Sequence, residues 1–249
     1  YGGTISSNTV ISTIYSSSNG GGVYIDRGAT FNMYGGTIEK NSAVCKDTSY
    51  GLGGGVAIEG NSVSRSDATT HGTFNMYGGT ISGNTAGKNG GGVYVGEGTT
   101  FNMTGGTISD NTAKANSIGN GGQGGGVYVD SGATFNMTGG TIGGTDAAGA
   151  NKASSGGGVY VAQNAKFNMT NGTISGNTAV GGGGVYVERS GDNIDPAVFA
   201  MTGGQITNNT VTGNGDNGGG GVYLQSSPSY TSTLKISGNP IINNNTRNS

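Results

Sequence analysis

The sequence predicts an all-β fold, a right-handed parallel β-helix of about seven coils with three short strands in each coil. Three observations predict this fold. A unit of roughly 26 to 37 residues recurs along the chain, and its apolar residues alternate with period two. Glycine accounts for 56 of the 249 residues, which suits a chain that turns sharply several times in each unit. Alternation places every second side chain on one face of a strand, and no stretch has a helical apolar period.

Each unit contains the same three short apolar segments, separated by Gly, Asn and Thr. The first segment is a Val-Tyr-Val triplet, with Ile25, Ile58 and Leu224 as variants of the last residue and Ala57 in place of one tyrosine. Its copies begin at Val23, Val56, Val93, Val127, Val159, Val185 and Val222. The second is a Phe-Asn-Met triplet that begins at Phe31, Phe74, Phe101, Phe135 and Phe167, with Phe-Ala-Met at Phe199 and a degenerate copy at Leu234. The third is centred on Ile5, Ile38, Ile81, Ile108, Ile142, Ile174, Ile206 and Ile241. These copies predict one β-helix domain over residues 1–249, with a partial coil at 1–22 and coils starting near 23, 56, 93, 127, 159, 185 and 222.

Other repeat architectures fit this unit less well. A propeller blade needs about 40 residues and four strands, and a leucine-rich repeat needs a leucine consensus that the unit lacks. In a parallel β-helix, equivalent strands of successive coils lie about 4.8 Å apart, so equivalent residues form ladders. The usual handedness of parallel crossovers predicts right-handed winding.

A polar residue stands three positions after the centre of each third strand. These residues are Asn8, Asn41, Asn84, Asn111, Thr145, Asn177, Asn209 and Asn244. Asparagine tolerates the backbone angles of a tight turn, and its side chain both donates and accepts hydrogen bonds. We therefore predict a structural asparagine ladder.

The outward-facing residues of the strands form further rows. We expect an exposed tyrosine row made of Tyr24, Tyr94, Tyr128, Tyr160, Tyr186 and Tyr223. Such a row could contact a sugar or a protein partner, or its rings could stack across the coils to shield the sheet. A second outward row, Asn32, Asn75, Asn102, Asn136 and Asn168, is expected to form an amide ladder.

The loop between the first and second strands is long in three units, at residues 59–73, 188–198 and 225–233. We expect these loops to project from one side as recognition elements. Arg65, Asp67 and His71 in the first loop are candidate contact residues, and Glu188, Asp192 and Asp195 in the second are candidate calcium ligands. We identify no catalytic residues and no cofactor or other metal site.

Charge, hydropathy and cysteine content limit the functional hypotheses that remain. The formal charge is −2 and the basic residues stand singly, so no nucleic-acid surface is expected. No apolar run is long enough to predict membrane insertion by this segment. Cys45 is the single cysteine and cannot form an internal disulfide. The chain starts and stops partway round a coil, so we expect it to be a piece of a longer protein whose uncapped ends could self-associate.

Two motifs carry a resemblance to a known family. The run from Ile81 to Ala86, Ile-Ser-Gly-Asn-Thr-Ala, is followed by Gly-Gly-Gly-Val at 90–93, and the pair recurs at 108–127 and 174–185. It resembles the FxxN and GGA(I/L/V) repeats of chlamydial-type polymorphic outer-membrane proteins, and related pectin-lyase-like surface repeats of spirochaetes and gut bacteria. It departs by having Ile in place of the aromatic residue and Gly-Gly-Gly-Val in place of Gly-Gly-Ala-Ile. The resemblance implies an exported bacterial β-helix, often an adhesin.

We therefore expect a non-catalytic surface or secreted bacterial protein that acts as a spacer or display scaffold. Its partner would be a host or cell-surface protein or a polysaccharide. One alternative is a polysaccharide-binding or carbohydrate-active module, and another is the subunit of a self-assembling filament.

Overall fold

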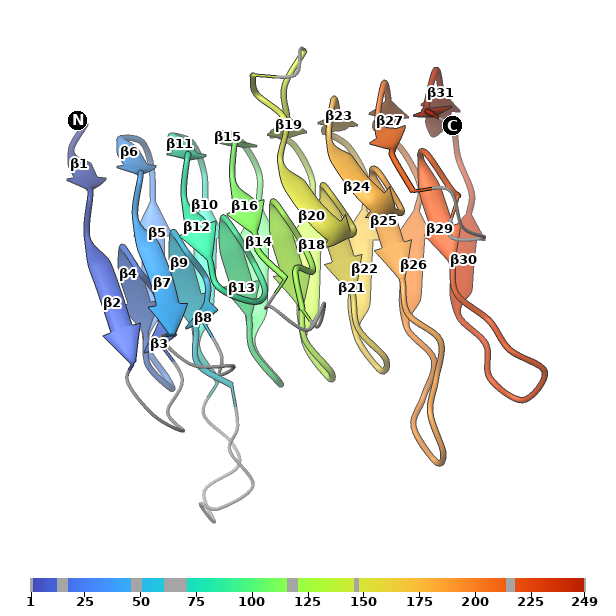
Figure 1. Cartoon of the computed structure of the whole chain (residues 1–249), viewed down its shortest axis with the longest axis horizontal. Helices are drawn as coiled ribbons and strands as arrows, with labels where there is room; N and C mark the ends of the chain where they lie inside the picture. The colour runs from blue at the N-terminus through green and yellow to red at the C-terminus, as the bar shows by residue number, and fades with distance from the viewer. Residues whose placement is uncertain are drawn as a thin grey trace.

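The computed structural model describes residues 2–12, 18–45, 51–60, 71–115, 121–145, 148–213 and 218–248. Figure 1 shows a stack of coils that advances steadily from the N-terminal to the C-terminal end. Every pairing in the four long sheets is parallel, and the chain is a right-handed parallel β-helix. In the residues described, no helix has the length and apolar character needed to cross a membrane.

Four sheets run along the stack, and each takes its name here from the residues of its strands. The tyrosine sheet comprises β4 (Val23–Ile25), β9 (Val56–Ile58), β13 (Val93–Val95), β17 (Val127–Val129), β21 (Val159–Val161), β25 (Val185–Val187) and β29 (Val222–Leu224). The phenylalanine sheet comprises β5 (Thr30–Met33), β10 (Thr73–Met76), β14 (Thr100–Met103), β18 (Thr134–Met137), β22 (Lys166–Met169), β26 (Val198–Met201) and β30 (Thr233–Ile236).

The other two long sheets complete each coil. The isoleucine sheet comprises β1 (Thr4–Ser6), β6 (Thr37–Glu39), β11 (Thr80–Ser82), β15 (Thr107–Ser109), β19 (Thr141–Gly143), β23 (Thr173–Ser175), β27 (Gln205–Thr207) and β31 (Ile241–Asn243). The threonine–alanine sheet comprises β2 (Thr9–Ser12), β7 (Ser42–Cys45), β12 (Thr85–Ala86), β16 (Thr112–Ala113), β20 (Lys152–Ser155), β24 (Thr178–Gly181), β28 (Thr210–Val211) and β32 (Thr246–Arg247). A short parallel pair, β3 (Ser18–Asn19) and β8 (Gly51–Leu52), lies beside β2 and β7 of the threonine–alanine sheet.

The three strands predicted for each coil are present, and the structure adds a fourth. In β12 and β16 the fourth strand is only a Thr-Ala pair that follows the turn at the asparagine. Its alanine points inward, and Ala86 is fully buried. A pair of residues with one small inward side chain is too short to show an apolar alternation, which is why the sequence did not reveal it.

The predicted register of the coils is confirmed. Phe101 pairs directly with Phe135, and Ile81 pairs with Ile108. The buried phenylalanine rings stack face to face, with centroids 4.6 to 5.1 Å apart from Phe31 to Phe199. These rings form one continuous core with the inward Val, Ile and Met side chains from Ile25 to Ile206. Burial of each such side chain contributes about 1.5–3 kcal/mol to folding. In the last coil the equivalent residues Leu224, Ile236 and Ile242 are exposed.

The asparagine ladder lies inside the coil and is fully hydrogen-bonded. Asn84 is completely buried. Its Nδ2 donates to Asn111 Oδ1 at 2.9 Å and to the Ile38 carbonyl at 3.0 Å, and its backbone N–H also donates to Asn111 Oδ1 at 3.0 Å. Each amide group therefore joins three successive coils at the same corner.

The prediction of Thr145 as the fifth member of this ladder is wrong, and Asn151 takes that place. The ladder continues from Asn111 to Asn151, with Nδ2 to Oδ1 at 3.0 Å, and then from Asn151 to Asn177 at 2.8 Å. Thr145 instead belongs to an extra loop between β19 and β20, visible as the upward projection in Figure 1. The chain returns from this loop to bring Asn151 into the buried site, because an unfilled position would leave neighbouring amide groups unsatisfied.

The last member is Asn245 and not Asn244. Asn209 Nδ2 donates to Asn245 Oδ1 at 2.9 Å. Ile206 pairs with Ile242, so the final corner after β30 contains one residue more than the others. Asn244 occupies the preceding left-handed turn position, with φ of 52°.

The third glycine of each Gly-Gly-Gly-Val run is required by this ladder. A Cβ on Gly92 would lie 2.7 Å from the Gly126 carbonyl oxygen and 3.0 Å from Asn111 Nδ2. A side chain at this position would therefore separate the coils where the buried amides meet.

A second asparagine row provides an internal comparison for the buried ladder. Asn102 Nδ2 donates to Asn75 Oδ1 at 2.8 Å, but this row lies on the outer face of the phenylalanine sheet and is half-buried. Asn111→Ala would leave three buried groups without partners, at about 1–3 kcal/mol each, so we expect a loss of at least about 3 kcal/mol of unfolding free energy. Water can replace the lost partner at Asn102, and Asn102→Ala is expected to cost under about 1 kcal/mol.

Denaturant unfolding of the two variants, followed by circular dichroism, measures this difference. Equal losses at the two positions would show that burial does not give the inner ladder its importance.

Candidate functional site

The tyrosines of the tyrosine sheet form a stacked column on its outer face. From Tyr94 to Tyr186 the ring centroids lie 4.9 to 5.6 Å apart with nearly parallel planes, and Tyr223 ends the column with a ring tilted by 41°. Ala57 occupies the equivalent position in β9, so Tyr24 stands apart from the column. The stacking predicted for this row is therefore confirmed for five of its six rings.

The prediction that the row is exposed is wrong at its centre. Tyr128, Tyr160 and Tyr186 are 8%, 2% and 5% exposed. Neighbouring rings cover both faces of each ring, and the segment that leads into each strand lies against its outer side. A Cβ on Gly182, for example, would be 3.1 Å from the ring atom Cδ2 of Tyr186. These three rings have no open face for a ligand, whereas Tyr24 is 47% exposed and Tyr94 and Tyr223 are half-buried.

A row of acidic residues lies beside the tyrosine column, and the sequence analysis missed it. The Tyr94 hydroxyl donates a hydrogen bond to Asp130, which is two residues beyond Tyr128 in the next coil. The Tyr160 hydroxyl likewise contacts the carboxylate of Glu188. An acidic residue two positions after a tyrosine was the available signal, because residues i and i+2 of a strand share a face.

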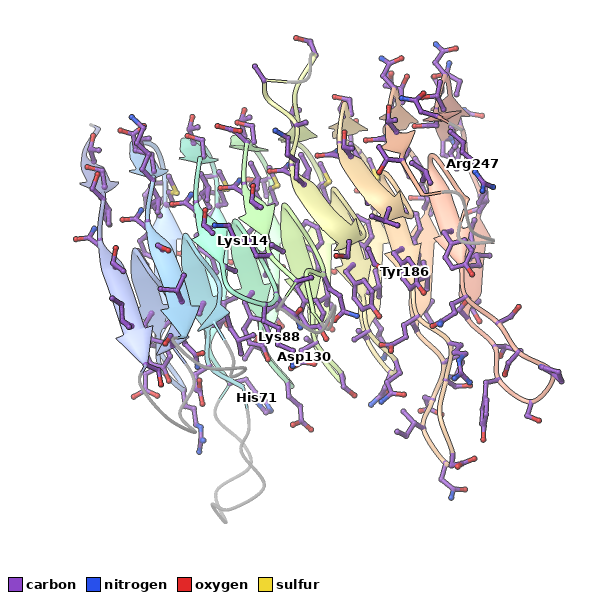
Figure 2. All side chains as sticks on the ribbon, viewed as in Figure 1. His71, Lys88, Lys114, Asp130, Tyr186 and Arg247 are labelled. Carbon is purple, nitrogen blue, oxygen red and sulfur yellow. The ribbon has the colours of Figure 1, made fainter. Side chains whose placement is uncertain are left out.

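Burial and these acids shift several pKa values on this face. Burial, and then the nearby carboxylates, raise the pKa values of Tyr94 and Tyr160 well above the usual value. Burial also lowers the pKa of Lys88, an effect that the nearby Asp130 opposes. Figure 2 shows Lys88 and Asp130 close together on the same side of the stack. Tyr94 and Tyr160 thus remain neutral hydrogen-bond donors at physiological pH.

The acidic row ends at a corner where loops from three coils meet. The 188–197 loop follows β25, the 225–232 loop follows β29, and both project from the lower edge in Figure 1. The Ser190 N–H donates to the Thr231 carbonyl at 2.8 Å, and the Tyr230 hydroxyl donates to Asp192. The turn of the fifth coil joins them, since the Asn164 N–H donates to the Asp195 carbonyl at 2.8 Å. The loops are therefore fixed to one another.

These loops border an open polar pocket of about 250 Å³, the candidate functional site. It is lined by Gln163, Glu188, Arg189, Ser190, Gly191, Asp192 and Tyr230. The Arg189 guanidinium lies over the Tyr230 ring, 5.2 Å from its centroid, where a cation–π interaction supports it. Glu188 accepts a hydrogen bond of 3.1 Å from the Gln163 N–H, and burial raises the pKa of its carboxyl. A guanidinium, two carboxylates and an aromatic ring thus line one recess.

Of the three candidate contact residues in the 59–73 loop, the structure describes only His71. Arg65 and Asp67 lie outside the described residues. His71 is exposed and lies against the turn of the next coil, where a Cβ on Gly98 would be 2.7 Å from its Cε1. Figure 2 shows it at the lower edge of the stack, away from Tyr186.

The calcium site considered for the 188–198 loop is not formed. Over the described ranges, no group of three or more His, Cys, Asp or Glu side chains is placed to hold a metal ion. Asp192 contacts Tyr230, and the backbone carbonyl of Asp195 accepts from Asn164. The Glu188 carboxylate accepts a hydrogen bond from the Gln163 N–H and contacts the Tyr160 hydroxyl.

No protein-family model, no curated protein and no solved structure matches the chain.

Glu188 gives a testable pH dependence. Its pKa is raised in the folded state, so the folded protein binds this proton more tightly than the unfolded chain does. The resulting stability is fully present below the unfolded pKa of about 4.3 and is lost as pH rises through the folded pKa. Glu188→Gln, which stays neutral, should match the native protein at about pH 4 and melt about 2 °C higher at pH 7, a small shift because solvent partly screens the site.

Thermal melts at both pH values check this expectation. Glu97→Gln removes an exposed carboxylate from the turn of the third coil and serves as the matched control. A Glu188→Gln variant that is less stable than the native protein at pH 7 would show that the ionised carboxylate is favoured there.

Proposed function

We propose that this chain is a non-catalytic scaffold, secreted by or displayed on a bacterial cell, that presents its long loops to a partner. The observation that carries the proposal is the contrast between a uniform core and one elaborated corner. Equivalent core residues pair in register through every coil, whereas the 188–197 and 225–232 loops extend from the same corner and hold each other in place. A rigid support with variable loops is a common arrangement for recognition.

The surface or secreted location rests on the resemblance of the repeats to bacterial surface proteins. The core motifs encode the coil itself, so they support an exported solenoid more strongly than they support adhesion. The partner would be a cell-surface protein or a polysaccharide contacted at the loop corner.

Among the candidate partners, a polysaccharide is favoured by the side chains that line the loop pocket. The loop pocket contains Arg189, Asp192, Gln163 and the Tyr230 ring, and planar polar side chains beside an aromatic ring suit the hydroxyls and faces of sugars. Self-assembly into filaments remains a prediction from the sequence alone. Electron micrographs of fibres along the coil axis would support it, and concentration-independent monomers in ultracentrifugation would contradict it.

A loop-replacement variant tests the proposed function. Residues 188–198 are replaced by the five-residue turn at 162–166, which connects the same two sheets in the fifth coil. We expect the native chain to bind a subset of an array of glycans and extracellular-matrix proteins. The variant should keep its β-sheet circular dichroism and lose that binding.

Two results would contradict the proposal. Binding that is unchanged in the loop-replacement variant would remove the loops from recognition. Formation of unsaturated uronides or new reducing ends from polyuronides by the native chain, abolished in Asp67→Ala or His71→Ala, would establish an enzyme instead.

A further inference from the structure

The loop pocket contains opposite charges that are not in direct contact, although Arg189 acts electrostatically on Glu188. Within the described chain, Arg189 forms no ion pair with Glu188 or Asp192, although all three line one recess of about 250 Å³. The Arg189 Nη1 reaches only the Ser227 hydroxyl, at 3.4 Å. A guanidinium with five donors is thus left with one long hydrogen bond.

Each charged side chain of the pocket contacts an uncharged group. The Tyr230 ring holds the guanidinium, and the hydroxyl of the same tyrosine holds the Asp192 carboxylate. The Gln163 N–H and the Tyr160 hydroxyl hold Glu188. These contacts come from three coils and keep the charges apart, although Asp192 is exposed and Arg189 and Glu188 are half-buried. The arrangement is preorganised for a ligand that supplies the missing countercharges.

We propose that the loop pocket binds a small zwitterionic group, whose carboxylate contacts Arg189 and whose ammonium contacts Asp192 and Glu188. The planar guanidinium suits a carboxylate, which it can bind through two parallel hydrogen bonds. The two acidic side chains are acceptors and require a donor, which an ammonium provides with three N–H groups. An anion alone would meet the two carboxylates, and a cation alone would meet the guanidinium, so each is opposed by one part of the pocket.

The recess has room for one amino acid or one monosaccharide unit. The zwitterion could therefore belong to a free amino acid or to an amino-sugar acid such as muramic acid. An amino-sugar acid would identify the sugar that the loops recognise in a polysaccharide. That identification rests on the proposed function.

Isothermal titration calorimetry and chemical-shift mapping of the whole chain test the proposal. Glycine, β-alanine and γ-aminobutyrate vary the distance between the two charges, while butyrate and butylammonium each carry one of them. Muramic acid is compared with N-acetylmuramic acid, which lacks the ammonium, and with glucosamine, which lacks the carboxylate. We expect at least one zwitterion to bind at least about tenfold more tightly than its single-charge analogues, with shifts at the Arg189 and Tyr230 signals.

Two variants and two controls locate the binding. Arg189→Gln and Asp192→Asn should each weaken zwitterion binding by at least about tenfold, because each removes one countercharge. Asn at position 192 can still accept from Tyr230, so the loops should stay joined. Lys235→Gln and Asp110→Asn remove charges elsewhere on the stack and should bind as the native chain does.

Equal binding of butyrate or butylammonium, or no binding of any zwitterion up to its solubility limit, would overturn the proposal. If the array binding of the native chain survives Arg189→Gln but is lost on loop replacement, the loops still recognise a partner and only the zwitterion assignment fails. If array binding survives both changes, the proposed function fails as well.

Discussion

The buried asparagine ladder is the constraint on which the rest of this structure depends. An amide in an apolar interior is costly unless all its hydrogen-bonding groups have partners. Here the hydrogen-bond partners of each amide include the asparagines at the equivalent position in the two neighbouring coils. The ladder thus fixes the register of successive coils, which apolar stacking alone would specify less sharply.

The other ladders follow from that register. Phenylalanine rings stack inside the coil at 4.6 to 5.1 Å, and tyrosine rings stack outside it at 4.9 to 5.6 Å. Their spacing is close to the distance between parallel strands, so aromatic contact and backbone pairing reinforce each other. The stack tolerates long insertions at its corners, because these leave the pairing of the strands unchanged. Residues 188–197 show this, since Phe199 still pairs with Phe167.

Much of the fold was predictable because its side-chain ladders repeat directly in the sequence. The departures have local causes. The fourth strand was missed because a Thr-Ala pair has too little pattern, and Asn151 was missed because an inserted loop separates it from β19. Less of the candidate site was predictable. Tyrosine burial depends on the neighbouring rings and the incoming chain, and the loop pocket joins residues of three coils whose contacts no spacing rule relates.

Hydrogen exchange of asparagine side-chain amides, followed by nuclear magnetic resonance, tests the central claim most directly. The Asn111 amide protons lie inside the stack, and those of Asn102 lie on its half-exposed outer face. The account predicts that the Asn111 protons exchange only when the surrounding coils unfold, far more slowly than the Asn102 protons. Fast exchange at both positions would contradict a buried ladder that fixes the register.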